Sequence, residues 1–153
     1  MSAVPLPQLH YRRMRVVDVL PVAALERDLY EFPWSAGNFR DSLAAGYDCW
    51  VACHGERLIG YAVLMIALDE AHLLNIAVDS AWHRQGIGRS FLDHMIGVAK
   101  GAGCQIVYLE VRPSNAVARH LYRRRGFHQI AIRPDYYPAR SGREDALFLG
   151  LTL

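Results

Sequence analysis

The stretch His83-Arg84-Gln85-Gly86-Ile87-Gly88-Arg89-Ser90, or HRQGIGRS, places two glycines one residue apart, between an apolar run and an amphipathic segment. Glycine permits a positive φ angle and lets another group come close to the main chain. The start of a helix also offers unpaired N–H groups and the positive end of the helix dipole. These features together suit an anion, most often a phosphate group. A tight strand-to-helix turn without a ligand explains the same eight residues equally well.

Two widespread phosphate-binding loops do not match this stretch. A P-loop has four residues between its glycines and a lysine after the second one, whereas here one residue separates the glycines and Arg89 follows them. A dinucleotide-binding fingerprint needs a third glycine where this chain has Phe91. If the stretch binds an anion, we therefore expect a polyphosphate that is held mainly by main-chain N–H groups.

The segments on either side alternate between strand and helix patterns. His72–Val78 is an apolar run that predicts a strand leading directly into the glycine loop. Ile106–Val111 predicts a later strand, and Asn115–Arg124 predicts the helix after it. A strand–helix–strand unit of this kind implies a parallel crossover. Its helix is indicated by residues that share one face, Phe91, Leu92, Met95, Ile96 and Ala99, and it ends at Gly101 and Gly103.

The remaining segments predict two early helices and several antiparallel strands. Asp18 can cap a helix that runs to about Leu29, and Ser35 can cap a second one to about Ala45. The other strands are Tyr11–Val17, Cys49–Cys53, Leu58–Leu68, Phe127–Arg133 and Ala146–Leu153, the last two separated by a polar loop that carries two tyrosines. The expected fold is α/β: a single domain over residues 1–153, with a mixed, mostly antiparallel sheet flanked by helices.

The overall composition is that of an ordinary globular domain. The chain has 153 residues, of which 52% are hydrophobic and 21% charged, and its net charge of +2 is too small to imply nucleic-acid binding. The three cysteines, Cys49, Cys53 and Cys104, have no metal-ligand spacing, and their odd number argues against a disulfide framework. We expect buried free thiols, no metal, no direct DNA binding, no membrane span and a cytoplasmic location.

Several motifs resemble one family. Two glycines that open a helix directly after Asn75–Val78 resemble the acetyl-CoA loop of the GCN5-related N-acetyltransferases. From about Phe32 to the C-terminus, the chain resembles their bacterial RimI-type branch, the ribosomal-protein alanine N-acetyltransferases. The motifs are FPWS at 32–35, DEA at 69–71, LEVR at 109–112, SN at 114–115, LY at 121–122, GF at 126–127, YYP at 136–138 and GREDA at 142–146. The tyrosine pair and the GREDA block indicate this branch, whereas the whole superfamily shares the glycine loop.

The resemblance implies an enzyme that moves an acetyl group from acetyl-CoA to the N-terminal alanine of a small-subunit ribosomal protein, the eighteenth. It implies that Glu110 is the proton acceptor and Tyr122 the proton donor. It also implies that the main chain before the loop pairs with the pantetheine arm, that the loop surrounds the pyrophosphate, and that one strand N–H, that of Val78, polarises the thioester carbonyl. The residues assigned to acetyl-CoA are Ile76, Ala77, Val78, Arg84, Gln85, Gly86, Ile87, Gly88, Arg89 and Asn115.

One position departs from the superfamily pattern. The superfamily usually has Gln or Arg three residues before the first glycine, and this chain has His83 there. Because the loop works through backbone N–H groups, we expect acetyl-CoA binding to survive the change. Only a side-chain contribution from this position is put in question.

The required chemistry also favours Glu110 and Tyr122, although each has a structural explanation. Acetyl transfer to an amine needs a proton acceptor for the ammonium and a donor for the oxyanion, and the leaving thiolate benefits from a proton. Glu110 ends an apolar strand, where a carboxylate is costly unless it is solvated, used in catalysis, or paired with Arg112 or another arginine. Tyr122 faces inward beside Ala118 and Leu121, as a core aromatic residue would.

The acceptor is expected to be an α-amine. An α-amino group has a pKa of about 8 and a lysine about 10.4, so at pH 7 roughly a tenth of α-amines are neutral but fewer than about one lysine in a thousand. A single carboxylate is better matched to the α-amine. For the acceptor-binding wall we predict Trp34, Tyr136, Tyr137 and Arg143, with loop packing as the alternative for the two tyrosines.

Other functions remain open at this point. The enzyme could act on other protein N-termini, on lysines, or on a small-molecule amine such as a polyamine or aminoglycoside, which would favour an acidic cleft. The chain could also be an acyl-CoA-binding module without catalysis, which would not need both Glu110 and Tyr122. A run of basic residues could form a solvated helix face, or it could bind the 3′-phosphate of CoA or ribosomal RNA. The run comprises Arg119, Arg123, Arg124 and Arg125.

Overall fold

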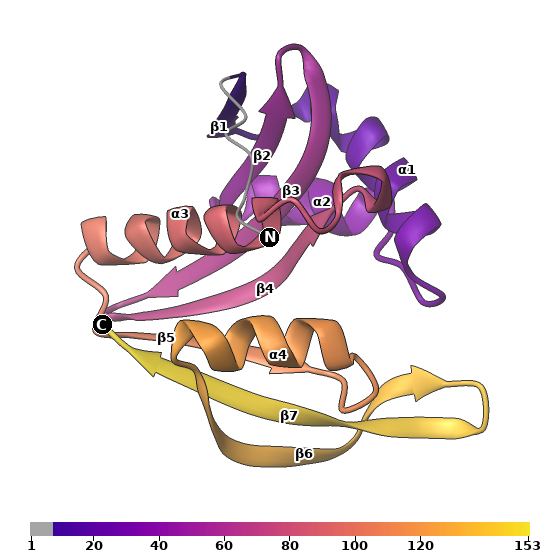
Figure 1. The fold of residues 1–153 in the computed structure, drawn as a ribbon, viewed down its shortest axis with the longest axis vertical. Coiled ribbons are helices and arrows are strands. Elements are labelled where there is room, and N and C mark those ends of the chain that lie inside the picture. Colours follow the sequence, from indigo (N-terminus) through magenta and orange to yellow (C-terminus); the bar gives the residue numbers. More distant parts are fainter. Residues whose placement is uncertain (1–7) are drawn as a thin grey trace.

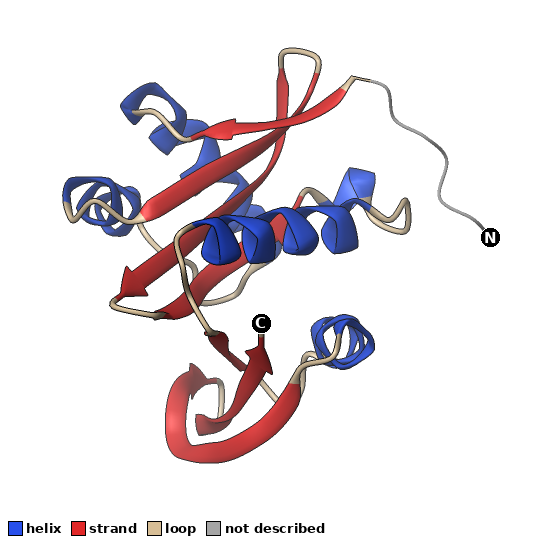
Figure 2. Ribbon diagram, turned by 90° about the vertical axis from the view of Figure 1, so that its left-hand side faces the viewer, coloured by secondary structure: helices blue, strands red, loops and turns tan. Residues whose placement is uncertain are grey.

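The computed structural model describes residues 8–153, which form a seven-stranded sheet with helices on both faces (Figure 1; Figure 2). The strands lie in the order β1-β2-β3-β4-β5-β7-β6. They are β1 (Leu9–Arg13), β2 (Asp48–His54), β3 (Arg57–Ala67), β4 (Glu70–Val78), β5 (Ile106–Val111), β6 (His128–Ala139) and β7 (Gly142–Thr152). The helices are α1 (Val19–Leu29), α2 (Ala36–Ala44), α3 (Ile87–Gly101) and α4 (Ala116–Arg125), with short 3-10 turns at Val16–Asp18 and Ser80–Trp82.

The order of the elements and the strand directions agree with the prediction. In the described part of the chain, β4 and β5 pair in parallel, and every other neighbouring pair of strands is antiparallel. α3 forms the crossover between the two parallel strands, as the strand–helix–strand pattern indicated. The predicted mixed, mostly antiparallel α/β fold is confirmed.

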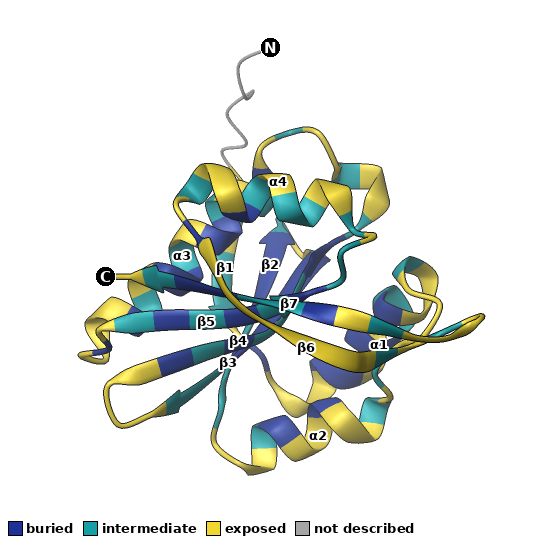
Figure 3. Ribbon diagram, turned by 90° about the horizontal axis from the view of Figure 1, so that it is seen from below, coloured by how far each residue is buried: buried dark blue, intermediate teal, exposed yellow. Residues whose placement is uncertain are grey.

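Two hydrophobic cores lie on opposite faces of the sheet. On one face, α1 and α2 bury apolar side chains such as Val22 and Phe39 against β2 and β3. On the other face, α3 and α4 bury side chains such as Phe91 and Tyr122 against the sheet, including Leu109 of β5. Helices that cover both faces explain why strands β2 and β3 are so deeply buried (Figure 3).

The three cysteines are buried free thiols, as expected. Among residues 8–153, no three or more His, Cys, Asp or Glu side chains are grouped so that they could hold a metal ion. None of the helices formed by these residues has the length and apolar content of a membrane span.

The predicted end of the first strand is wrong. β1 stops at Arg13, and a 3-10 turn occupies Val16–Asp18, where the sequence pattern predicted strand. Asp18 accounts for this turn, because its carboxylate accepts the N–H of Arg15 at 2.7 Å and the guanidinium of Arg12 at 2.8 Å. It caps this turn and makes no side-chain cap bond to α1. The cap predicted at Ser35 is confirmed, since its Oγ accepts the N–H of Asn38 at 3.1 Å.

The polar loop predicted between the last two strands is also wrong. β6 continues through both tyrosines to Ala139, and β7 begins at Gly142. The β6–β7 register shifts between Arg133 and Tyr137, so that residues 134–136 lie opposite the single residue Asp145. β6 is an exposed edge strand (Figure 3), a place where a proline and a bulge are tolerated.

β4 and β5 pair over only part of their length. Their parallel pairs run from Glu70 and Ile106 to Leu73 and Leu109. At the same place the β3–β4 register shifts, which leaves Leu74 as an extra residue of β4. Beyond it the two strands diverge (Figure 1), so 75–78 pair with β3 but not with β5. The main-chain groups of 75–78 that point toward β5 therefore lack a strand partner.

Candidate active site

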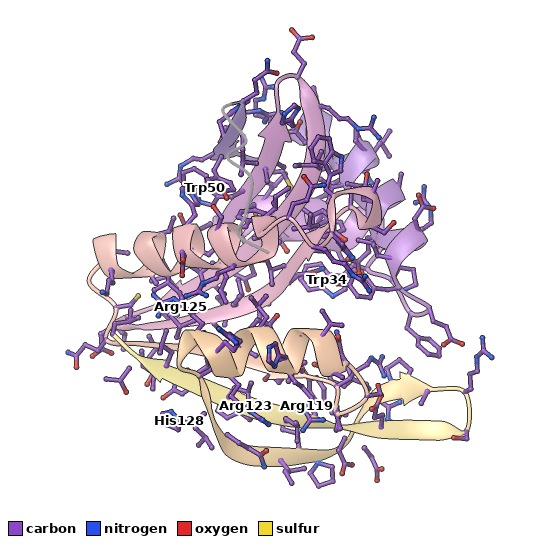
Figure 4. The ribbon with its side chains drawn as sticks, in the orientation of Figure 1. Trp34, Trp50, Arg119, Arg123, Arg125 and His128 are labelled. Carbon is purple, nitrogen blue, oxygen red and sulfur yellow. The ribbon has the colours of Figure 1, made fainter. Side chains whose placement is uncertain are left out.

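A cleft of about 730 Å³ lies where β4 and β5 separate. Its walls come from the end of α1 and the segment after it, the diverging parts of β4 and β5, the start of α4, and the tyrosine-bearing part of β6. Trp34 lies between the levels of α1 and α4 (Figure 4). Predicted site residues that line the cleft are Trp34, Ile76, Glu110, Asn115, Tyr122, Tyr136 and Tyr137.

The Glu110 side chain is only 9% exposed and is held from two strands. Its Oε2 lies 2.5 Å from Nε2 of His72 on β4, and its Oε1 lies 3.3 Å from Nε of Arg133 on β6. Arg112 does not pair with it, because its guanidinium donates to Glu144 at 3.2 Å. Glu110 thus pairs with an arginine, which is the structural explanation considered for a carboxylate at the end of this strand. It also lines the cleft, where it is available for catalysis.

Tyr122 is buried in α4 and also lines the cleft. Its ring packs edge-on against Phe127, with the ring centroids 5.8 Å apart. Burial, with smaller contributions from Tyr30 and Tyr137, raises the pKa of its hydroxyl. The group therefore keeps its proton at neutral pH and is available as a proton donor.

The bulge of β6 carries Tyr136 and Tyr137 to the cleft. Their rings are nearly perpendicular, at 86°, and the Arg112 guanidinium lies 4.4 Å from the centroid of Tyr137. Arg143 is not among the residues that line the cleft. Its guanidinium donates to the main-chain oxygens of Asp135 at 2.7 Å and Tyr136 at 2.8 Å, and so holds the bulge in place.

The glycine loop forms the N-terminus of α3, outside the cleft lining. Gly86 occupies the cap position with φ of 79°, a conformation that favours glycine. The N–H of Ser90 makes a helical bond to the oxygen of Gly86 at 3.0 Å. The N–H groups of residues 87–89 precede it and have no intrahelical partner, as at any helix start. Arg84 and Gln85 belong to the turn before the helix, and Arg89 to its first turn.

His83 turns back onto the preceding strand. Its Nε2 donates to the main-chain oxygen of Val78, 2.6 Å away. The carboxylate of Asp79 accepts the N–H of Ala81 at 3.0 Å in the same turn. The residue that departs from the superfamily pattern therefore stabilises the connection between β4 and the glycine loop.

Sequence reasoning missed Glu26, a buried carboxylate that lines the cleft. It accepts hydrogen bonds from the Trp34 N–H at 2.9 Å, the Tyr61 hydroxyl at 2.7 Å and the Asn75 amide at 3.1 Å. These bonds offset the cost of burying its charge and tie α1 to β3, β4 and the segment before α2. Its spacing was a usable signal, because it continues the buried helical stripe of Val19, Val22 and Ala23.

Comparison with known proteins agrees with this geometry. The model of the acetyltransferase (GNAT) family matches residues 19–127. The ribosomal protein bS18-alanine N-acetyltransferase of Escherichia coli (strain K12) is 39% identical over 135 residues, which make up 88% of this chain and 91% of that protein. The crystal structure of the ribosomal-protein-S18-alanine N-acetyltransferase from Escherichia coli has a TM-score of 0.88 at 35% identity and covers 94% of this chain and 93% of that one. The structure of Ard1 from Thermoplasma volcanium, at 22% identity, shares the fold with a TM-score of 0.85 and covers 95% of this chain and 98% of that one.

The family match extends over most of the elements that form the site. Residues 19–127 include α1, the separation of β4 from β5, the glycine loop and α4. Both predicted proton-transfer residues, Glu110 and Tyr122, also lie within this range. The chain belongs to the acetyltransferase (GNAT) family.

Proposed function

We propose that the protein transfers the acetyl group of acetyl-CoA to the N-terminal alanine of ribosomal protein bS18. The observation that carries the proposal is one cleft that contains a nearly buried carboxylate, a protonated phenol and a wall of aromatic side chains. The relatives named for this reaction support the choice of acceptor. An acceptor on a ribosomal protein implies a cytoplasmic reaction.

Acetyl-CoA fits the unpaired side of β4. On that side the main-chain groups of Ile76 and the N–H of Val78 can pair with an extended pantetheine arm, much as an added strand would, whereas Ala77 between them faces β3 and the Val78 oxygen already has a side-chain partner. The free N–H groups and the positive end of α3 suit the pyrophosphate. On the other side of the cleft, Asn115 uses its side-chain oxygen to accept the N–H of Ala118 at 3.2 Å, which leaves its NH₂ group available to donate.

The residues of the cleft divide the chemistry between them. Glu110 takes a proton from the α-ammonium, directly or through a water, and the neutral nitrogen attacks the thioester carbon. The N–H of Val78 stabilises the negative charge on the carbonyl oxygen. Tyr122 gives its proton to the sulfur as the C–S bond breaks, and the second proton that the nitrogen loses as the amide forms returns to the Tyr122 oxygen.

The acceptor is tested most directly in cells. Ribosomal protein bS18 from cells that lack this chain should carry a free N-terminal alanine when intact-protein mass spectrometry is applied. Supplying the chain again should restore the acetyl group, and supplying Glu110→Gln should not. Normal acetylation of bS18 in the deficient cells, with loss of acetylation at lysines or on a small amine, would replace the proposed acceptor. No acetylation change of any kind would favour the non-catalytic acyl-CoA-binding alternative.

Gly88→Val tests whether the glycine loop binds the pyrophosphate. A side chain at Gly88 would meet only an ordinary contact, Leu121 at 3.8 Å, so the fold should tolerate it. It would occupy the space toward α4 in which a phosphate must approach the helix N–H groups. Loss of one charge-assisted hydrogen bond predicts an affinity for acetyl-CoA that is about 10- to 100-fold weaker by calorimetry.

Gly97→Val is the matched control for this change. Gly97 lies in the same helix, and a side chain there has nothing within 4 Å. Both variants replace a helical glycine with valine, which has the higher helix propensity, so neither should unfold at a lower temperature than the unaltered protein. Equal acetyl-CoA affinity in the two variants would remove the loop from the binding site.

Tyr122→Phe tests the proton donor. The substitution removes the hydroxyl but keeps the ring that packs against Phe127. We expect kcat to fall by roughly 10- to 100-fold, less than the usual loss of about 10²- to 10⁴-fold for a positioned acid, because a thiol pKa of about 8.5 makes thiolate a tolerable leaving group. A thioester whose thiol is more acidic should reduce this loss, and an unchanged kcat with acetyl-CoA would leave Tyr122 with a packing role alone.

A further inference from the structure

His72 of β4 contacts the carboxylate to which the proposed function assigns proton removal. Its Nε2 is 2.5 Å from Oε2 of Glu110, while Arg133 is 3.3 Å from Oε1. Each carboxylate oxygen therefore has one side-chain donor and keeps a lone pair for a further partner. The side chain of His72 is 22% exposed, and His72 is not among the residues that line the cleft. It supports the carboxylate from outside the space that the reactants would use.

The sheet places this contact beside the separation of β4 and β5. His72 pairs with Tyr108 across the parallel strands, one position before the last pair. Side chains two apart on a strand share a face, so Tyr108 and Glu110 project to the same side. That side is opposite the core under α3 and α4, in which Leu109 is buried. The pairing of β4 with β5 thus fixes the position of His72. The carboxylate that it contacts belongs to Glu110, which lies just beyond the last β4–β5 pair.

The neighbours of His72 include several charged groups. Phe148 of β7 packs against the His72 ring, with centroids 6.2 Å apart, and lies under the Arg133 guanidinium at 5.0 Å. Met65 is the partner of His72 on β3 and carries no charge. The titratable and charged groups around the contact are Glu70 on β4 itself, Tyr108 and Glu110 on β5, and Arg133 and Tyr137 on β6.

We propose that His72 is a positioning residue for the general base. With a proton on Nε2, it donates to Oε2 and turns the Glu110 carboxylate toward the acceptor amine. This inference rests on the proposed role of Glu110 as the base.

The test compares His72→Ala and His72→Gln with the unaltered protein, using acetyl-CoA and a peptide that begins with alanine. Without the donor the carboxylate can rotate, and because about 1 Å of misplacement can cost about 100-fold, we expect His72→Ala to lower kcat by about 10- to 100-fold near pH 7. The KM for acetyl-CoA should not change. The side-chain NH₂ of glutamine can take the place of the histidine Nε2–H, so His72→Gln should recover most of the lost kcat.

Measurement at higher pH separates positioning of a base from a general structural role. With an α-amine pKa of about 8, more than about nine-tenths of the peptide is already neutral near pH 9.5. A base is then hardly needed, and the deficit of His72→Ala should shrink to less than about 3-fold. An equal deficit at both pH values, or no recovery in His72→Gln, would show that His72 only supports the fold and would overturn the inference.

Two further variants keep the outcomes distinct. His10→Ala changes an exposed histidine on the edge strand β1, three strands away from β4, and should behave like the unaltered protein. If Glu110→Gln loses activity near pH 7 while His72→Ala does not, the positioning role is wrong and the proposed base stands. If Glu110→Gln keeps full activity, the proposed base and the positioning role both fall.

Discussion

Glu110→Gln is expected to lower kcat by about 10²- to 10⁴-fold near neutral pH, the usual range for a positioned general base. The amide keeps the shape of the side chain and retains an oxygen that can accept from His72 or Arg133. It cannot take the proton of the attacking ammonium. The KM for acetyl-CoA should change little, because Glu110 lines the cleft and the glycine loop lies outside the cleft lining. Initial rates of thiol release from acetyl-CoA, with an alanine-initiated peptide, measure both quantities.

The pH dependence of this deficit has a definite sign. The acceptor amine has a pKa of about 8, so raising the pH from about 7 to about 9.5 removes its proton without help from the enzyme. The difference between Glu110→Gln and the unaltered protein should therefore narrow as the pH rises. Glu56→Gln, in the exposed turn between β2 and β3, is the matched control and should have normal rates. A deficit that is the same at every pH would assign Glu110 a structural role.

Local sequence patterns were sufficient for elements whose partners lie nearby. α3 follows from apolar residues at helical spacing after Gly86, and these residues are buried in the structure. β5 follows from a short apolar run, and the predicted helix Asn115–Arg124 corresponds to α4, which Asn115 caps and Gly126 ends. Strand–helix–strand order then fixed the parallel pair. In these places the same residues determine both the local conformation and the buried face.

The extended β6 could not be read locally. Pro134 and Asp135 are turn residues, and their presence favoured a loop. The strand continues because distant groups hold the bulge: the Asp135 N–H donates to the Asp145 carboxylate at 3.0 Å, and Arg143 donates to two main-chain oxygens. These contacts depend on the register between β6 and β7, which residue spacing does not specify.

Contacts that depend on strand pairing also limit what can be predicted of the site from the sequence. Motif resemblance selected residues that the fold does bring into one cleft, among them Glu110 and Tyr122. It did not provide the partners of Glu110, because His72 lies 38 positions away and meets it only through the parallel pairing of β4 with β5. Arg143 was predicted to be part of the acceptor-binding wall. It does not line the cleft, and instead its guanidinium donates to the main-chain oxygen of Tyr136, which does.

A strong preference for an N-terminal α-amine is the second large effect that we expect. A peptide that begins with alanine should have a kcat/KM at least about 100-fold higher than a peptide whose α-amine is blocked and whose only amine is a lysine, because ionisation alone favours the α-amine by about that factor near pH 7. The same peptide beginning with tryptophan should also be slow. Its nitrogen must come to about 3 Å from the thioester carbon, and a displacement of about 1 Å can cost about 100-fold.

The geometry behind this preference lies in the cleft walls. We expect the nitrogen to enter beside Glu110, where β4 and β5 separate, and the following residues to extend along Trp34, Tyr136 and Tyr137, which line the same cleft. Tyr137→Ala removes the ring that packs under Arg112 and should therefore raise the KM for the peptide. The KM for acetyl-CoA should stay nearly the same, because the unpaired side of β4 and the glycine loop are not altered.

The choice of peptides separates this reading from its competitors. The alanine and tryptophan peptides differ only in their first residue, so a difference between them reports the space around the attacking nitrogen. The blocked peptide reports the kind of amine, and a polyamine tests whether a small cation is preferred. Faster acetylation of the lysine-only peptide or of the polyamine would replace an N-terminal acceptor with that amine. Equal rates for alanine and tryptophan peptides would mean that selectivity comes from the aromatic wall and not from limited space around the attacking nitrogen.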